Sequence, residues 1–302
     1  YLTNETVFSL TELPRRLAVI GAGPIGCELA QAFARFGSQV FLIEALHGIM
    51  PNEDRDAAEI VKKSMDRDRI QLMCCGKDLK VSRVLDGGKR LTVDSHGQHY
   101  DITVDEILIG AGRQPNVDGL GLETVGVEYD LKAGVKVNDR LRTTNPRIFA
   151  VGDICSRFKF THAADAMARI VIQNALFFGR AKASGLTIPW CTYTDPEVAH
   201  VGMYEQEAKD RGIPVQTFVQ EFSHVDRAIL DGDTDGFVRV HVRTWTDKIV
   251  GATVVARHAG EMISEITLAM TAGVGLGTIA KSIHPYPTQS EAIKRVADAY
   301  NR

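Results

Sequence analysis

The sequence predicts an α/β fold in three parts: a βαβ domain with a β-meander insert, part of a second α/β domain, and a C-terminal α+β domain. The first part is indicated by an apolar run at residues 16–20, a glycine-rich turn, and apolar residues at helical spacing before a second apolar run at residues 39–44. Short β-branched runs separated by Gly-containing gaps, at residues 81–104, indicate the meander. Consecutive strand patterns followed by helical ones after Pro189 indicate the α+β domain.

Each element of the first domain follows from a local signal. Ile25, Leu29 and Phe33 recur at helical spacing, and Gly37 is placed to end that helix as a left-handed residue. Further strands are expected at residues 39–44, 70–73 and 106–109, and a further helix at about 53–69. The meander strands are expected at residues 81–85, 90–94 and 100–104, joined by turns at 86–89 and 95–98. The domain is expected to close near Gly112.

The rest of the chain divides at about residue 185. Residues 113–185 contain strand patterns at 135–137 and 148–151 and one helical pattern at 162–178. These elements are too few to bury a sheet of their own, so we expect them to complete a sheet begun elsewhere. For residues 186–302 the expected elements are strands at 215–221, 236–243 and 249–255 and helices at 260–272 and 290–300.

Charge and hydropathy exclude two classes of protein. The 35 Lys and Arg residues nearly balance 38 Asp and Glu residues, for a net charge of −3, so the chain lacks the basic surface that holds nucleic acid. Its mean hydropathy is −0.07. Its longest uncharged run, residues 266–280, is rich in Gly and Thr and too short to span a bilayer. We therefore expect no nucleic-acid partner and no membrane span.

The N-terminus and the cysteines favour a cytoplasmic protein. No basic segment followed by an apolar one marks a signal peptide. The five cysteines form no C-x-x-C pair and no zinc-type spacing, as expected in a reducing compartment without a disulfide scaffold. Adjacent Cys74 and Cys75 are residue types that bind soft metals. The favoured interpretation is that these thiols pack as small apolar groups where a strand ends, and we expect no bound metal.

The hexapeptide GAGPIG lies between the first strand and the first helix, which Pro24 and Ile25 open. Gly21 permits the tight turn, Gly23 lets the backbone approach a pyrophosphate, and Gly26 lets the helix pack closely on the strand. The helix N-terminus adds free N–H groups and the positive end of the helix dipole. Any tight strand-to-helix turn uses glycine, but the βαβ context favours a Rossmann-like, dinucleotide-binding domain.

An acid, Glu44, ends the second strand about 20 residues after the glycine turn. At this position a carboxylate accepts hydrogen bonds from the ribose hydroxyls of NAD and repels the 2′-phosphate of NADP. The next four residues contain no Arg to bind such a phosphate, although His47 offsets the carboxylate when it is protonated. We expect NADH to be preferred, with NADPH as the alternative.

Seven motifs, in order, resemble the pyridine nucleotide-disulfide oxidoreductases, the family of lipoamide dehydrogenase, glutathione reductase and mercuric reductase. The resemblance covers essentially the whole chain. The motifs are YLTN leading into GAGPIGCE (ending at 28), ILIGAGRQPN (107–116), TTNPRIFAVGD (143–153), FTHAA (160–164), TDPEVAHVG (194–202), DRAILDGDTDGFVRV (226–240) and HPYPTQSE (284–291). The resemblance implies hydride transfer from NAD(P)H through FAD to a cysteine pair, and a homodimer formed by the C-terminal domain.

The resemblance also implies which residues contact FAD. They are Gly112, Gly152, Asp153, Phe160, Thr161, His162 and Ala163. Asp153 would hydrogen-bond the ribitol, and the segment from Phe160 would place a helix N-terminus near the flavin edge that becomes negative on reduction. Taken alone, Asp153 is explained by an Asx turn and His162 by a backbone contact beside a helix cap. Glu28 resembles the acid that pairs with a flavin-side lysine where hydride arrives, but an acid in a first helical turn also suits the helix dipole.

The C-terminal motif departs from that of lipoamide dehydrogenases. There, a His oriented by a Glu is the acid/base, whereas here the string from His284 to Glu291 has Tyr286 at the position of the base. A phenol with a pKa of about 10 is a poor base at neutral pH, and imidazole, at about 6.5, is well matched. Mercuric reductases resemble this chain in having Tyr there, which favours a metal ion such as Hg(II) as acceptor unless His284 reaches in as the base. The alternative is a proline-rich turn that caps the last helix through Ser290, with Tyr286 packed.

Two parts of the family pattern are not among these 302 residues. They are a first FAD segment, with its own glycine fingerprint and a C-x-x-x-x-C pair, and the paired C-terminal cysteines of many mercuric reductases. We therefore expect an NAD(P)-binding domain at residues 1–112, the C-terminal part of an FAD-binding domain at 113–185, and a dimerisation domain at 186–302. Two hypotheses stay open: the back portion of a flavin-dependent disulfide or metal-ion reductase, or a nucleotide-binding and dimerisation fragment without catalysis of its own.

Overall fold

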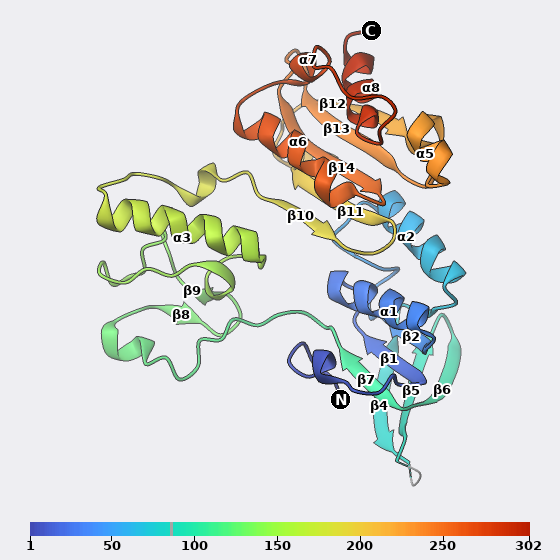
Figure 1. The fold of residues 1–302 in the computed structure, drawn as a ribbon. Helices are drawn as coiled ribbons and strands as arrows, with labels where there is room; N and C mark the ends of the chain where they lie inside the picture. Colours follow the sequence, from blue (N-terminus) through green and yellow to red (C-terminus); the bar gives the residue numbers. More distant parts are fainter. Residues whose placement is uncertain (85–86) are drawn as a thin grey trace. The chain divides into compact units, whose positions relative to one another are not determined.

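The computed structural model describes residues 1–84 and 87–302. They form two compact units: Tyr1–Gly112 together with Cys191–Arg302, and Arg113–Trp190 (Figure 1). The chain thus leaves the first unit after Gly112 and returns to it at Cys191. No helix in the described part of the chain is both long and apolar enough to cross a membrane.

A parallel four-stranded sheet forms the N-terminal half of the first unit. Its strands, in the order β3-β2-β1-β7, are β3 (Gln71–Met73), β2 (Gln39–Ile43), β1 (Arg16–Ile20) and β7 (Glu106–Ile109). The helices are α1 (Pro24–Phe36) and α2 (Arg55–Arg67). Gly37 ends α1 with φ 110°, which confirms the predicted left-handed residue. The second helix is shorter than expected because Arg69, at φ 61°, is already outside helical geometry.

The predicted meander forms a three-stranded antiparallel sheet. Its strands are β4 (Lys77–Arg83), β5 (Lys89–Ser95) and β6 (Gln98–Val104). Leu85 and Asp86, which end the expected strand 81–85 and begin the expected turn 86–89, lie outside the described residues. The first strand begins earlier than expected because pairing with β5 reaches back to Lys77, opposite Asp94, although this segment is polar.

The C-terminal half of the first unit is an α+β domain with a five-stranded sheet in the order β10-β11-β14-β13-β12. Its strands are β10 (Pro189–Thr192), β11 (Glu197–Gly202), β12 (Val215–Glu221), β13 (Phe237–Arg243) and β14 (Ile249–Ala256). Its helices are α4 (Glu205–Asp210), α5 (Asp226–Asp231), α6 (Ala259–Thr271), α7 (Leu276–Ile279) and α8 (Glu291–Tyr300). The first two strands were not predicted, because β11 is buried on both faces and lacks the alternation that marks a half-buried strand.

Side chains join the two halves of the first unit. Val198, Phe237 and Val255 belong to the same apolar core as β1, α1 and α2. Arg239 on β13 also pairs with Asp54 at 2.9 Å. The N-terminal and C-terminal stretches therefore share one core, although 78 residues, Arg113–Trp190, separate them in sequence.

The second unit contains one long helix, α3 (Thr161–Leu176), and the short strands β8 (Tyr129–Asp130) and β9 (Gly134–Val135). The expected strand 148–151 is not formed. A strand requires a neighbouring backbone that bonds along its length, and here an isolated bridge joins Phe149 to Arg142.

The 3-10 helices among the described residues are η1 (Val7–Ser9), η2 (Leu122–Val125), η3 (Gly152–Ile154), η4 (Ala183–Gly185) and η5 (Phe222–His224).

Candidate functional site

The three glycines of the turn between β1 and α1 are needed for different reasons. Gly21 has φ 101°, and a Cβ there would lie 2.8 Å from the carbonyl carbon of Gly110. A Cβ on Gly26 would lie 1.9 Å from the carbonyl oxygen of Gly21. By contrast, a Cβ on Gly23 would meet no atom within 4 Å. The chain's own packing therefore explains Gly21 and Gly26, whereas Gly23 borders open space.

The N-terminus of α1 opens at the same turn. Gly23 is the N-cap, Pro24 occupies the first turn, and no side chain caps the helix. The first N–H groups of such a helix lack partners within it. Together with the dipole they favour an anion, so the open space beside Gly23 fits a pyrophosphate. Pro24 is exposed and Ile25 half-buried.

Glu44 directly follows β2 and reaches the glycine turn. Its Oε2 accepts a hydrogen bond from the Ala22 N–H at 2.7 Å, and its Oε1 accepts one from the Leu46 N–H at 2.9 Å. The side chain is half-buried. Each carboxylate oxygen has a further lone pair, so Glu44 retains acceptors for the ribose hydroxyls of a dinucleotide.

Glu28, in the first part of α1, faces the start of the C-terminal domain. Its Oε1 accepts a hydrogen bond from the Tyr193 N–H at 2.8 Å. In the same C-terminal domain, burial raises the pKa of the Glu197 carboxyl, and the hydrogen bond that this carboxylate accepts from the Gly260 N–H partly offsets the rise. Glu28 is therefore held by the backbone of a segment distant in sequence.

Three of the cysteine thiols are poor nucleophiles. All five cysteines are free. Burial raises the pKa of Cys27 to about 12 and that of Cys155 to about 11, and it also raises the pKa of Cys191. Redox-active cysteines have a lowered pKa because the thiolate is the reacting form. None of these three cysteines fits the role of the family's reactive pair.

In the second unit, Gly152 and α3 form the candidate flavin site. Gly152 has φ 75°, and a Cβ there would lie 3.0 Å from the Ala164 Cβ, so glycine lets η3 approach α3. Asp153, next in sequence, is exposed. Phe160 is the N-cap of α3 and provides no side-chain cap. The helix N-terminus is therefore available for the negative edge of a flavin, and these residues fit FAD.

Aromatic side chains lie beside that helix N-terminus. The Phe160 ring stacks on His162, with 5.4 Å between ring centroids, and on Trp190 at 6.4 Å. The His162 Nε2 lies 2.7 Å from the Pro189 carbonyl oxygen, as in the backbone contact considered as an alternative. Thr161 is exposed and Ala163 buried. Trp190 was missed because nothing in its local sequence indicates this stack.

Gly112, at the end of the first unit, is exposed and has φ 102°. A Cβ there would meet no atom within 4 Å. Its positive φ favours glycine for the backbone conformation alone.

The three residues expected to act together in the C-terminal motif have separate partners. Tyr286 is 69% exposed, and its hydroxyl donates to Asp226 Oδ2 at 2.8 Å. This hydrogen bond raises the pKa of Tyr286. His284 instead lies 2.8 Å from Glu265, and its side chain is nearly buried. Tyr286 is thus not packed, and its acidic partner was not predicted.

Glu291, the first residue of α8, accepts hydrogen bonds through one of its two carboxylate oxygens. Its Oε1 accepts from Arg295 Nε at 2.9 Å. Its Oε2 is buried and has no hydrogen-bond partner among the described residues. Ser290 is the N-cap but makes no side-chain capping bond, so the capping alternative is wrong in this respect.

Two family descriptions match the chain. Residues 1–168 match the pyridine nucleotide-disulphide oxidoreductase family, and residues 188–297 match its dimerisation domain. A dihydrolipoyl dehydrogenase of Thermus scotoductus is 35% identical over 291 residues, which cover 96% of this chain and 63% of the relative. A mercuric reductase of Staphylococcus aureus is 33% identical over 304 residues, which cover 100% of this chain and 55% of the relative.

Solved structures agree with these matches. The HOCl-induced flavoprotein disulfide reductase RclA from Escherichia coli superimposes with a TM-score of 0.88 at 28% identity, covering 98% of this chain and 67% of that one. LpdA from Mycobacterium tuberculosis gives a TM-score of 0.90 at 27% identity, covering 99% and 64%. The chain thus spans 55% to 63% of the two curated relatives described. From the matched sequence and the shared fold, the chain belongs to the pyridine nucleotide-disulphide oxidoreductase family.

Proposed function

We propose that this chain is the nicotinamide-nucleotide-binding, partial flavin-binding and dimerisation portion of a flavin-dependent oxidoreductase. The observation that carries the proposal is the open space at Gly23, bordered by the uncapped N-terminus of α1, with the carboxylate of Glu44 across the turn. That arrangement offers N–H donors for a pyrophosphate and acceptors for a ribose. NADH is the proposed donor, because a 2′-phosphate would be repelled by Glu44.

This chain's residues bind and orient the reactants. The N-termini of α1 and α3 would each stabilise negative charge, on the pyrophosphate and on the flavin respectively. Asp153, exposed beside Gly152, would accept a hydrogen bond from the ribitol. The hydrogen bond from the Tyr193 N–H would fix the side chain of Glu28, the counterpart of the acid that pairs with a flavin-side lysine. FAD, when bound, supplies two-electron chemistry between NADH and a cysteine pair. The proposed pair lies outside these 302 residues.

A metal ion such as Hg(II) is the favoured acceptor, with a disulfide second. Tyr286 donates to Asp226, and its raised pKa keeps the phenol protonated at neutral pH. Reduction of a disulfide requires a proton donor for the departing thiolate, and a phenol of raised pKa is a weaker acid than an imidazolium, whereas a thiolate-bound metal ion needs no proton transfer. The match to the family's dimerisation domain supports a homodimer formed through residues 188–297.

The second candidate is a nucleotide-binding and dimerisation fragment without its own catalysis. It is favoured by the raised pKa values of Cys27 and Cys155, since neither thiol is a reactive thiolate at neutral pH. Purifying the chain with FAD present separates the two candidates. A yellow protein whose flavin absorbance is bleached anaerobically by NADH supports the oxidoreductase, whereas a colourless dimer that still binds NADH supports the fragment.

The class of electron acceptor is tested with a protein that includes the coding sequence upstream of these 302 residues. NADH oxidation with Hg(II), lipoamide or a quinone identifies the acceptor class, and no oxidation with any of them would overturn the proposal. In that protein Tyr286→His is expected to raise the rate with lipoamide, because an imidazole gives and takes protons at neutral pH and its protonated form can supply the departing thiolate. Tyr286→Phe, which adds no proton-transfer group, is the matched control.

A further inference from the structure

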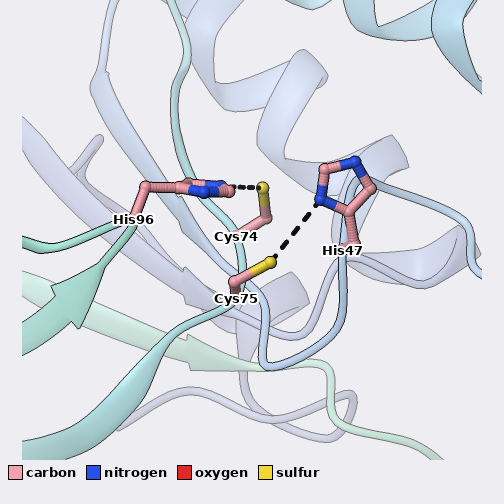
Figure 2. A group of neighbouring side chains, drawn as sticks. All are labelled: His47, Cys74, Cys75 and His96. Atoms are coloured by element: carbon pink, nitrogen blue, oxygen red, sulfur yellow. Dashed lines mark hydrogen bonds between the residues drawn. The ribbon is translucent and has the colours of Figure 1, made fainter.

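Four metal-ligating side chains that are not assigned to the nucleotide converge in the N-terminal half of the first unit: His47, Cys74, Cys75 and His96 (Figure 2). They come from three separate segments of the described chain, after β2, after β3 and between β5 and β6. Figure 2 shows both thiols between the two imidazole rings. The ligand atoms all lie within 4.8 Å of one another. Each thiol thus has an imidazole partner, which the expected apolar packing of Cys74 and Cys75 did not include.

Two of the distances between ligand atoms are close to the edge of a tetrahedral zinc site, and all of them are within 4.8 Å. The Cys74 Sγ lies 3.2 Å from His96 Nε2, and the Cys75 Sγ lies 3.5 Å from His47 Nδ1. With Zn–S and Zn–N bonds of about 2.3 and 2.0–2.1 Å, the edges of a tetrahedron are about 3.3–3.8 Å long. Shifts of exposed side chains by about 1 Å would therefore close the site around an ion.

Hydrogen bonds hold the three segments together without a metal. The Cys75 N–H donates to the Leu46 carbonyl at 2.9 Å, and the Ser95 hydroxyl donates to the Cys74 carbonyl at 2.5 Å. Cys75 and His96 have φ values of 56° and 51°, a conformation that non-glycine residues rarely adopt. The cluster is thus built on a fixed backbone, with Cys74 buried and both histidines exposed.

We propose that His47, Cys74, Cys75 and His96 form a Cys2His2 site for a borderline-soft divalent cation, with Zn2+ as the expected ion. Two thiolates balance the charge of the ion, and two neutral imidazoles complete the tetrahedral set that zinc prefers. Binding releases the two thiol protons to solvent. A site closed by four protein ligands leaves no position for water or substrate, so its role is to cross-link the segments.

Zinc binding to the reduced, chelator-stripped chain tests the site. Titration against a chromophoric chelator is expected to give one Zn2+ per chain. Cys75→Ser with His47→Gln should weaken binding by more than the roughly 10–100-fold that loss of an outer-shell partner costs. Neither of these residues is buried, so the variant is expected to fold. Cys155→Ser with His99→Gln, a thiol and an exposed imidazole outside the cluster, is the matched control and should bind like the wild type.

Two further measurements make the result specific. Co2+ is expected to give a thiolate-to-cobalt charge-transfer band and the intense visible bands of tetrahedral cobalt in the wild type and the control only. Zn2+ should raise Tm in the same two proteins and not in the cluster variant. Equal zinc affinity in all three proteins, or a wild type without the tetrahedral cobalt spectrum, would overturn the proposal and leave only thiol–imidazole hydrogen bonds.

Discussion

The carboxylate of Glu44 lies across the glycine turn from α1 and accepts a hydrogen bond from the Ala22 N–H at 2.7 Å. The end of β2 and the turn after β1 are thereby joined beside the open space at Gly23. An acid fixed in this position discriminates between nucleotides through its charge. Replacing that charge by an amide should therefore change nucleotide preference, while the amide oxygen accepts only one of the two backbone N–H bonds that the carboxylate accepts.

Glu44→Gln is expected to weaken NADH binding by about 10-fold, or about 1.4 kcal/mol, and to weaken NADPH binding less. The amide accepts one fewer charge-assisted hydrogen bond and no longer repels a 2′-phosphate. Isothermal titration with both nucleotides measures the ratio of their affinities. Glu59→Gln, at an exposed position of α2, is the control. An unchanged NADH-to-NADPH ratio in Glu44→Gln would contradict the role given to this acid.

Gly23→Ala is expected to weaken nucleotide binding, whereas Gly26→Ala is expected to destabilise the fold. Gly23 has φ −72°, which alanine adopts, so Gly23→Ala should keep the stability of the wild type but lose NADH affinity by about 10-fold or more. Gly26→Ala places a Cβ 1.9 Å from a backbone oxygen and should lower the free energy of unfolding by about 1–3 kcal/mol or more. Urea unfolding and NADH titration of both variants test this. Equal stability losses would refute the assignment of Gly23 to ligand binding.

The Tyr286 phenol is expected to titrate above its ordinary pKa of about 10. Its hydrogen bond to Asp226 stabilises the neutral form, and the nearby carboxylate repels the phenolate. The difference in tyrosinate absorbance between the wild type and Tyr286→Phe isolates this group. Asp226→Asn should lower the midpoint, whereas Asp235→Asn, at an exposed position, should not. A midpoint below 10 in the wild type would restore the phenol as a candidate base.

The buried imidazole of His200 is expected to destabilise the folded chain in acid. Burial lowers its pKa to about 3, from an ordinary value near 6.5, and its Nδ1 lies 2.9 Å from the Thr253 hydroxyl. Between these two values the unfolded chain binds a proton that the folded chain does not. Stability should therefore fall as pH drops from 6.5 toward 3, by up to about 1.4 kcal/mol per pH unit, with no contribution above 6.5.

Urea unfolding at several pH values measures this slope. His200→Gln should show a shallower fall than the wild type, whatever its stability at neutral pH. His224→Gln, at an exposed position, is the control and should keep the wild-type slope. Identical slopes in the wild type and His200→Gln would rule out His200 as the source of acid sensitivity.

Features set within a few residues of sequence were predicted well. The strand, glycine turn and helix around Gly26 follow from local sterics, because the close approach of Gly26 to Gly21 involves residues only five positions apart. The same holds for Gly37 at the end of α1. Glu44 was identified because strand length fixes where β2 ends. In such segments the allowed backbone dihedral angles restrict the conformation before any tertiary contact forms.

Features that depend on pairing between distant segments were not predicted. The polar start of β4 and the buried β11 are strands because β5 and β14 bond to them, and their own sequences give no alternation to detect. The segment 148–151 was predicted as a strand but does not form one, because a single isolated bridge, from Phe149 to Arg142, is its only recorded pairing among the described residues. Extended backbone becomes a strand only through its neighbour.

By itself, the sequence determined the family, the dinucleotide turn and the acid beside it, since motif order and local geometry are carried by neighbouring residues. Only the tertiary structure decided the partners of long side chains: Tyr286 with Asp226, His284 with Glu265, and the two cysteines with two histidines. Asp226 and Glu265 lie on α5 and α6 and the two histidines lie on loops. The spacing of these partners in sequence has no fixed relation to their distance in space. Packing of the sheets and helices sets that distance, so the chemistry of these groups emerges only when the chain has folded.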